Sequence, residues 1–104
     1  MTKLVLAILL ACAVVSAARA QVVGDAREGL ALAQETCSRC HATVAQQSRS
    51  PNPLAPRFAE LAATPGITST ALLVALTTPH AGMPMFNLTG EQRDDIIAYI
   101  LSLH

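Results

Sequence analysis

Apolar residues recur every three or four positions in several stretches of the chain, which is the spacing of one face of a helix. The first such stretch extends from Asp25 to about Thr36. Its small or apolar face consists of Ala26, Gly29, Leu30 and Ala33. Asp25 is followed three residues later by Glu28, a form of capping box, so we expect a helix to begin there.

A loop and two shorter helices are expected in the middle of the chain. Residues 42–57 read as a loop because several prolines prevent a regular helix. These prolines are Pro51, Pro53 and Pro56. A short helix is expected over residues 58–63. Either Thr68 or Ser69 can then cap a further helix that ends at residue 76 or 77.

The last helix is expected to begin at Thr89, with Gln92 at the capping-box position. A second loop, residues 78–88, precedes it. The apolar positions of this helix are Ile96, Ile97, Tyr99, Ile100, Leu101 and Leu103. The positions left to solvent are Asp94, Asp95 and Ser102. No stretch has a convincing strand pattern, so we predict an all-α domain with two loops long enough to flank a flat ligand.

The first twenty residues have the pattern of an export signal. Lys3 gives a positively charged n-region, and Leu4 to Val15 form an apolar run. Ala18-Arg19-Ala20 then matches a small-x-small cleavage site. We therefore expect residues 1–20 to be a cleaved signal peptide and the remainder to be periplasmic. A retained anchor is the alternative, but the apolar run is shorter than the about 20 residues of a membrane span. A lipoprotein site at Cys12 would follow an even shorter run.

The mature domain, residues 21–104, is small and poor in aromatic residues. It carries five arginines, no lysine and seven acidic residues, so it lacks the basic patch of a nucleic-acid-binding protein. It has no tryptophan, and its aromatic residues are Phe58, Phe86 and Tyr99. A domain of about 84 residues often needs an additional staple to support its core. A large, flat, apolar cofactor would supply one.

The segment Cys37-Ser38-Arg39-Cys40-His41 has the C-x-x-C-H signature of c-type haem attachment. Two thiols three positions apart lie along one helical turn, where they can add to the two vinyl groups of a porphyrin. His41 follows directly, so its imidazole can bind the iron from the proximal side. We therefore expect one covalent haem c, with thioethers from Cys37 and Cys40. A thiol–disulfide pair is the alternative, but those motifs open a helix after a strand, whereas this one closes a helix.

The sixth position of the iron decides the function, and four side chains can fill it: Met83, Met85, His80 and His104. The first three lie in the loop 78–88, which two prolines stiffen and one glycine loosens. A thioether is a soft, neutral donor that suits such a loop. Packing beside the ring is the other role open to Met85. We expect His80 to be a solvated loop histidine and His104 to fray with the terminus.

Three segments carry a resemblance to a known family: Met83-Pro84-x-Phe86, Leu88-Thr89 and Ala98-Tyr99-Ile100. Together they resemble the distal loop and C-terminal helix of the class I c-type cytochromes. The resemblance extends over nearly the whole mature chain. It implies a fold in which the N- and C-terminal helices cross and three to four helices surround one haem. It also implies Met83, directly before a proline, as the distal ligand, with Met85 as the second choice.

Two further positions match this family. Gly29 lies eight residues before the first cysteine of the motif, where these proteins have a glycine that packs against an aromatic residue of the last helix. Tyr99 corresponds to that aromatic residue. Pro56 resembles the proline whose carbonyl accepts the Nδ1–H of the haem histidine, here His41, although the two other prolines of the loop compete for this role. The chain departs from some members in having no tryptophan for a propionate.

The resemblance implies a periplasmic electron carrier and not an enzyme. With both axial positions filled, the iron changes charge without binding a substrate. The expected partners are redox proteins, namely an oxidase, dehydrogenase or reductase, met in transient contacts by a monomer. Membrane association is expected only if the signal is retained. The alternative is a haem-based gas sensor or peroxidase with a labile sixth ligand, although no histidine–arginine pair for peroxide cleavage is evident.

Overall fold

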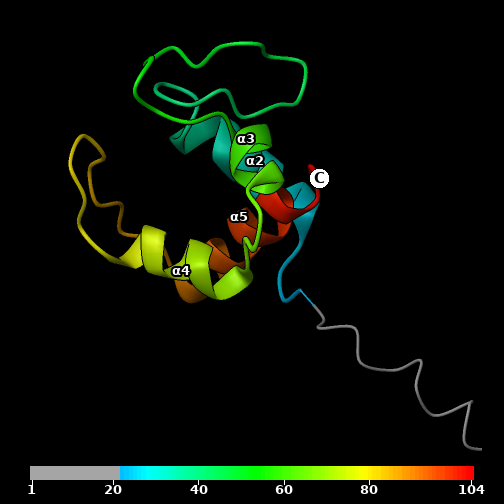
Figure 1. Cartoon of the computed structure of the whole chain (residues 1–104). Helices are drawn as coiled ribbons and strands as arrows, with labels where there is room; N and C mark the ends of the chain where they lie inside the picture. The colour runs from blue at the N-terminus through cyan, green and yellow to red at the C-terminus, as the bar shows by residue number, and fades with distance from the viewer. Residues whose placement is uncertain (1–21) are drawn as a thin grey trace, which may run out of the picture.

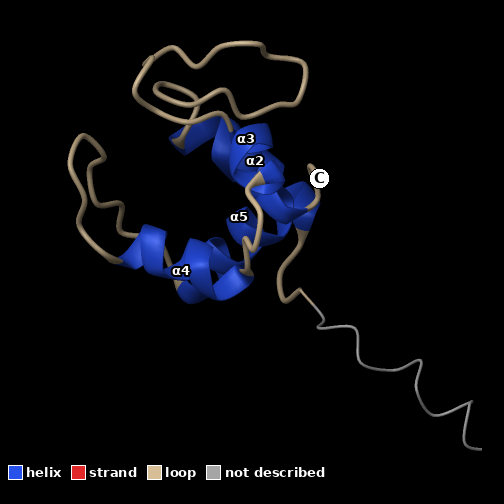
Figure 2. Ribbon diagram, in the orientation of Figure 1, coloured by secondary structure: helices blue, strands red, loops and turns tan. Residues whose placement is uncertain are grey.

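The computed structural model describes residues 22–104, which form four helices and no strand (Figure 1, Figure 2). The helices are α2 (Ala26–Thr36), α3 (Phe58–Ala63), α4 (Ser69–Thr77) and α5 (Gly90–Leu101). The prediction of an all-helical fold is confirmed. The expected signal peptide, residues 1–20, lies outside the described residues. Within 22–104, no helix combines the length and apolar character that a membrane crossing requires.

Two of the helices begin at the capping residues that the sequence predicts. Thr68 accepts a hydrogen bond from the backbone N–H of Ala71 at 3.1 Å and thereby caps α4. At α5, Thr89 Oγ1 accepts from the Gln92 N–H at 3.1 Å, and Gln92 Oε1 accepts from the Thr89 N–H at 2.9 Å. This reciprocal pair satisfies two backbone donors that a helix start leaves without partners.

The start of α2 differs from the prediction in one respect. Asp25 caps the helix, since its carboxylate accepts from the Arg27 N–H at 2.8 Å. The N–H of Asp25 itself donates to Asp95 Oδ1 on α5 at 2.7 Å, and not to Glu28. The predicted capping box is therefore wrong, because α5 lies close enough to supply the acceptor. Asp95 and its neighbour Asp94, both expected to face solvent, are half-buried.

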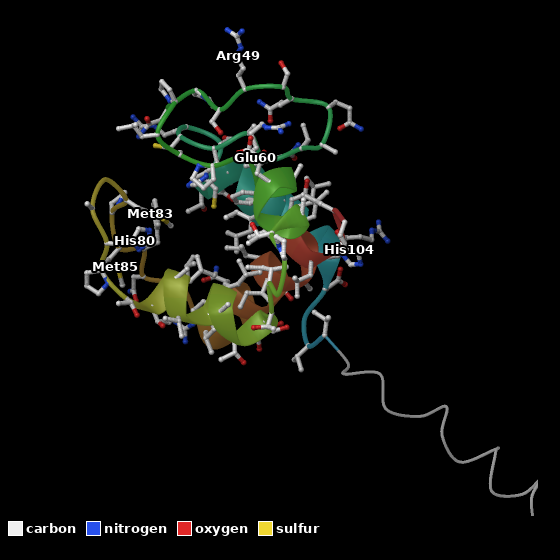
Figure 3. The ribbon with its side chains drawn as sticks, viewed as in Figure 1. Arg49, Glu60, His80, Met83, Met85 and His104 are labelled. Atoms are coloured by element: carbon white, nitrogen blue, oxygen red, sulfur yellow. The ribbon has the colours of Figure 1, made fainter. Side chains whose placement is uncertain are left out.

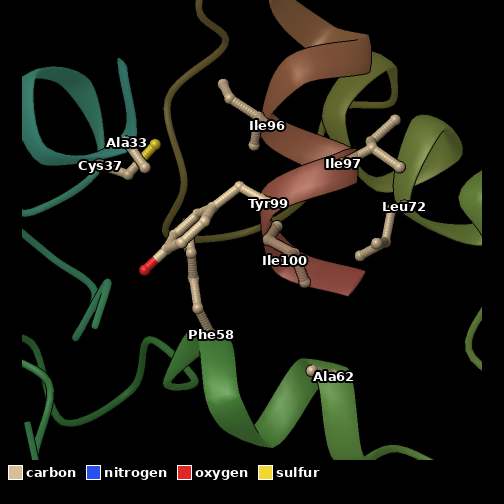
Figure 4. Close-up of a cluster of buried hydrophobic side chains, with 9 residues drawn as sticks. All are labelled: Ala33, Cys37, Phe58, Ala62, Leu72, Ile96, Ile97, Tyr99 and Ile100. Carbon is tan, nitrogen blue, oxygen red and sulfur yellow. The ribbon is translucent and has the colours of Figure 1, made fainter. Parts of the chain in front are cut away.

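Helices α2 and α5 cross at Gly29. The glycine is buried, and a Cβ at this position would collide with the carbonyl of Asp95 and lie 2.8 Å from Tyr99 Cβ. The expected contact between the glycine and the aromatic residue is therefore present. Side chains from all four helices and the C-cap of α2 meet in one core cluster (Figure 4), formed by Ala33, Cys37, Phe58, Ala62, Leu72, Ile96, Ile97, Tyr99 and Ile100.

Two long connections form wide arches in Figure 1. The first connects α2 to α3 and contains the C-x-x-C-H motif and the prolines. The second connects α4 to α5 and contains Met83 and Met85, the two methionines that are candidate ligands. Because each arch is held at its two ends by packed helices, the haem-attachment motif and part of the loop 78–88 border a common space.

Candidate functional site

The two arches and the helix faces between them enclose a cavity of about 690 Å³. Apolar side chains of α3, α4 and α5 form much of its wall, namely Phe58, Leu61, Leu72, Leu76, Ile96 and Ile100. Among residues 22–104, Arg39 contributes charge to the lining, and no acidic side chain does. A cavity of this size and polarity is typical of a site for a mainly apolar cofactor.

The C-x-x-C-H motif extends α2 by one turn into the cavity wall. The N–H of Cys37 donates to the carbonyl of Ala33 at 2.8 Å, and the N–H of His41 donates to the carbonyl of Cys37 at 3.0 Å. These bonds bring Cys37, Cys40 and His41 to the same cavity. Cys37 is buried and Cys40 is half-buried.

The imidazole of His41 is held by a backbone carbonyl. Its Nδ1 lies 2.7 Å from the carbonyl oxygen of Pro56, rather than from that of Pro51 or Pro53. A carbonyl can only accept, so Nδ1 carries the hydrogen and Nε2 keeps its lone pair. The ring of Phe58 packs against the imidazole, with centroids 5.3 Å apart and planes at 51°. The imidazole thus has the tautomer that a metal ligand requires.

Further backbone contacts hold the first arch in place. The N–H of Asn52 donates to the carbonyl of Cys40, and that of Phe58 to the carbonyl of Ala42, each at 3.0 Å. The hydroxyl of Tyr99 donates to the carbonyl of Thr43, which belongs to a buried residue. The sequence carries no signal for these carbonyl acceptors, because every residue has one. The sequence offers one hint for Phe58: it lies two residues after Pro56, and therefore close to the carbonyl that binds His41.

A tight turn shapes the second arch. His80 and Met83 pair across it, with the N–H of Met83 donating to the carbonyl of His80 at 3.4 Å. Gly82 occupies the third position with φ +81°, the conformation that favours glycine in a type II turn. Met83 is half-buried and lines the cavity, whereas Met85 is 52% exposed and does not.

The two histidines that are candidates for the sixth position of the iron, His80 and His104, lie on different sides of the molecule (Figure 3). His80 lies beside Met83 and also lines the cavity, although its side chain is exposed. His104 lies on the other side of the molecule, at the C-terminus. The structure therefore brings His41, His80 and Met83 to one cavity and leaves Met85 and His104 outside its lining.

Comparison with known proteins agrees with the family resemblance noted in the sequence. The family described as "Cytochrome C oxidase, cbb3-type, subunit III" matches residues 24–100. Cytochrome c-552 of Bradyrhizobium diazoefficiens is 38% identical over 96 residues, which span 92% of this chain and 91% of that protein. The chain belongs to the class I c-type cytochromes. No solved structure matches it.

The cytochrome therefore carries covalently bound haem c with its iron, and it is a haem-based electron carrier. The residues of the cavity fit this group. Two thiols, an imidazole with a free Nε2 and a thioether reach one largely apolar space from two separate segments of the chain, residues 37–41 and the loop that contains Met83. These donor types are those that hold haem c and ligate its iron.

The thiol pair of the cytochrome does not suit dithiol catalysis. Burial raises the pKa of the Cys37 thiol to about 11, and the neighbouring Cys40 adds to the shift. A nucleophilic redox cysteine needs the opposite shift, toward the thiolate at neutral pH. The environment of Cys37 is instead that of a side chain packed into the core.

The second arch of the cytochrome is anchored from α5. Arg93 Nη1 donates to the carbonyl of Leu88 at 2.8 Å, just before the cap of α5. The Nε of the same guanidinium is buried without a hydrogen-bond partner among the described residues. A half-buried arginine thus holds the end of the arch that carries Met83, a role that the sequence did not suggest.

Proposed function

We propose that this cytochrome is a periplasmic carrier of single electrons whose haem iron is ligated by His41 and Met83. The observation that carries the proposal is that Met83 lines the cavity that Cys37, Cys40 and His41 also line, whereas Met85 is exposed outside it. Bound haem supplies a one-electron couple at its iron. The chain supplies two ligands to the iron and a largely apolar pocket around it.

Each residue of the site has a separate task in this proposal. The thiols of Cys37 and Cys40 form the covalent thioethers. The Pro56 carbonyl orients His41 and makes its Nε2 a stronger donor. Met83 contributes a neutral thioether, which together with the apolar walls favours the less charged ferrous state and raises the potential.

Electron exchange with partners is proposed to occur across the apolar rim of the cavity. Pro84 and Phe86 line the cavity near its rim, and Met85 is exposed beside them. Small apolar surfaces of this kind support brief contacts with redox partner proteins. An oxidase, a dehydrogenase or a reductase could serve as partner. Residues 1–20 are proposed to direct export and then to be removed, leaving a monomeric domain of residues 21–104.

The test is a pair of matched methionine variants of the haem-loaded protein. Met83→Ala should abolish the far-red sulfur-to-iron charge-transfer band of the oxidised protein, because the thioether leaves the iron. Met85→Ala should keep this band and leave the wild-type protein's indifference to carbon monoxide unchanged. The measurement is an optical spectrum, oxidised and reduced, with and without carbon monoxide.

Two results would contradict the proposal. If Met85→Ala removes the band and Met83→Ala does not, the ligand assignment is wrong. If the wild-type protein binds carbon monoxide readily, the iron is accessible and the gas-sensor or peroxidase function gains support.

A further inference from the structure

A second histidine outside the haem-attachment motif lines the cavity of the proposed iron site, and the function proposed above does not use it. His80 lines the same cavity as Met83. The two residues occupy the first and fourth positions of the turn closed by Gly82, so their backbones pair directly. The turn therefore brings two different donor types, a thioether and an imidazole, to one part of the wall.

The imidazole of His80, like that of His41, has its Nδ1 beside a backbone carbonyl oxygen. Its Nδ1 lies 3.1 Å from the carbonyl oxygen of Thr78. Because a carbonyl can only accept, Nδ1 carries the hydrogen and Nε2 keeps its lone pair. The pairing repeats the one between His41 and Pro56, and a backbone carbonyl on the other nitrogen is a usual feature of metal-binding histidines.

The loop between these residues can rearrange locally. Gly82 adopts a positive φ, and no atom lies within 4 Å of the position that its Cβ would take. The turn is thus free of side-chain packing at its hinge. The arch is held at its far end by the Arg93 hydrogen bond to Leu88. A rotation at the turn can therefore exchange the side chains without moving the helices.

We propose that His80 is an alternative axial ligand, whose Nε2 binds the haem iron when the thioether of Met83 leaves. This inference rests on the proposed Met83 ligation and adds a second state of the same site. A methionine thioether raises the reduction potential of the haem, and a second imidazole in its place does not. The exchange thus converts the carrier to a form of lower potential whose iron stays six-coordinate and closed to external ligands.

The test compares Met83→Ala with the double variant Met83→Ala/His80→Asn, both with covalent haem. In the single variant the far-red band should disappear, while the iron should stay low-spin, have a lower potential than wild type and resist carbon monoxide. The double variant should be high-spin and bind carbon monoxide. The matched control Met83→Ala/His104→Asn should behave like the single variant. Absorption and electron paramagnetic resonance spectra report the spin state.

Wild-type protein provides an independent measurement. At a guanidinium concentration just below global unfolding, the wild type should lose the far-red band and stay low-spin, whereas His80→Asn should become high-spin. His80→Asn without denaturant should keep the band, which also verifies that this variant folds.

Three results would overturn the proposal. A high-spin iron in Met83→Ala would show that His80 does not bind. A low-spin iron in the His80 double variant would assign the ligand to another group. Persistence of the far-red band in Met83→Ala would overturn the proposed Met83 ligation itself, and is thereby distinguishable from the other two.

Discussion

Backbone carbonyls determine the state of several side chains in this cytochrome. The carbonyl of Pro56 selects the tautomer of His41, and that of Thr78 does the same for His80. The carbonyl of Thr43 accepts the hydroxyl of Tyr99, and burial of this phenol raises its pKa. The tautomer or the hydrogen bond of each of these side chains therefore depends on which carbonyl lies beside it.

Gly29→Ala should lower the free energy of unfolding strongly. A Cβ at this position collides with the Asp95 carbonyl and approaches Tyr99, so the two helices must separate, at a cost of about 3 kcal/mol or more. Gly90→Ala is the matched control, because only the end of the Arg93 side chain lies near, at 3.9 Å. The control should be neutral or stabilising by about 0.5 kcal/mol.

The measurement is guanidinium unfolding of the haem-loaded variants followed by helical circular dichroism. Equal midpoints for Gly29→Ala and the wild type would mean that the helices tolerate a side chain at their crossing, contrary to the close approach described here.

At the scale of elements, two features define the arch between α4 and α5: the turn at Gly82 and the hydrogen bond of Arg93. The turn at Gly82 places Met83 in the wall of the cavity. The guanidinium of Arg93 holds the carbonyl of Leu88 and thereby the end of the arch. The turn sets the position of the thioether, and the arginine limits how far the segment can move away.

Arg93→Gln should weaken the attachment of the arch more than it weakens the fold. Loss of the donor leaves the half-buried Leu88 carbonyl without its partner, at a cost toward the lower end of the about 1–3 kcal/mol of a buried group. The far-red band should therefore disappear at a lower guanidinium concentration than in the wild type, while the helical signal shifts less. Arg27→Gln, an exposed arginine of α2, is the control and should change neither.

If the band and the helical signal of Arg93→Gln shift by the same amount, the arginine supports the whole domain and not the arch in particular. Measuring both signals on the same samples separates these outcomes.

At the scale of the whole molecule, the helices do not form a complete core by themselves. The cluster of buried side chains is small, and it borders a cavity of about 690 Å³. Protein interiors contain few voids larger than a water molecule. The cofactor is therefore part of the core, which agrees with the scarcity of aromatic residues in the sequence.

Removal of the haem attachment should unfold the chain. Cys37→Ala/Cys40→Ala cannot form the thioethers, and apolar residues around the cavity then face water. We expect most of the helical circular dichroism signal and the cooperative thermal transition to be lost. Met85→Ala, which keeps the haem, is the control and should retain both. A cooperative transition with full helicity in the double cysteine variant would show that the helices suffice.

The helices could be predicted from the sequence because their determinants are local. Thr68 and Thr89 mark helix starts, prolines exclude helix from the first arch, and apolar spacing identifies the buried faces. The C-x-x-C-H motif likewise lies within five consecutive residues. Hydrogen bonds and side-chain spacing over three or four positions mark these features in the sequence. The stability of the helices comes from the packed core and the haem.

Only the tertiary structure decided which distant groups meet. It placed Met83 and not Met85 in the cavity wall, and it selected the carbonyl of Pro56 for His41. It also replaced the expected partner of Asp25 by Asp95, 70 residues away. Such contacts form when packed helices bring distant backbone groups together. The spacing of residues along the chain does not predict them.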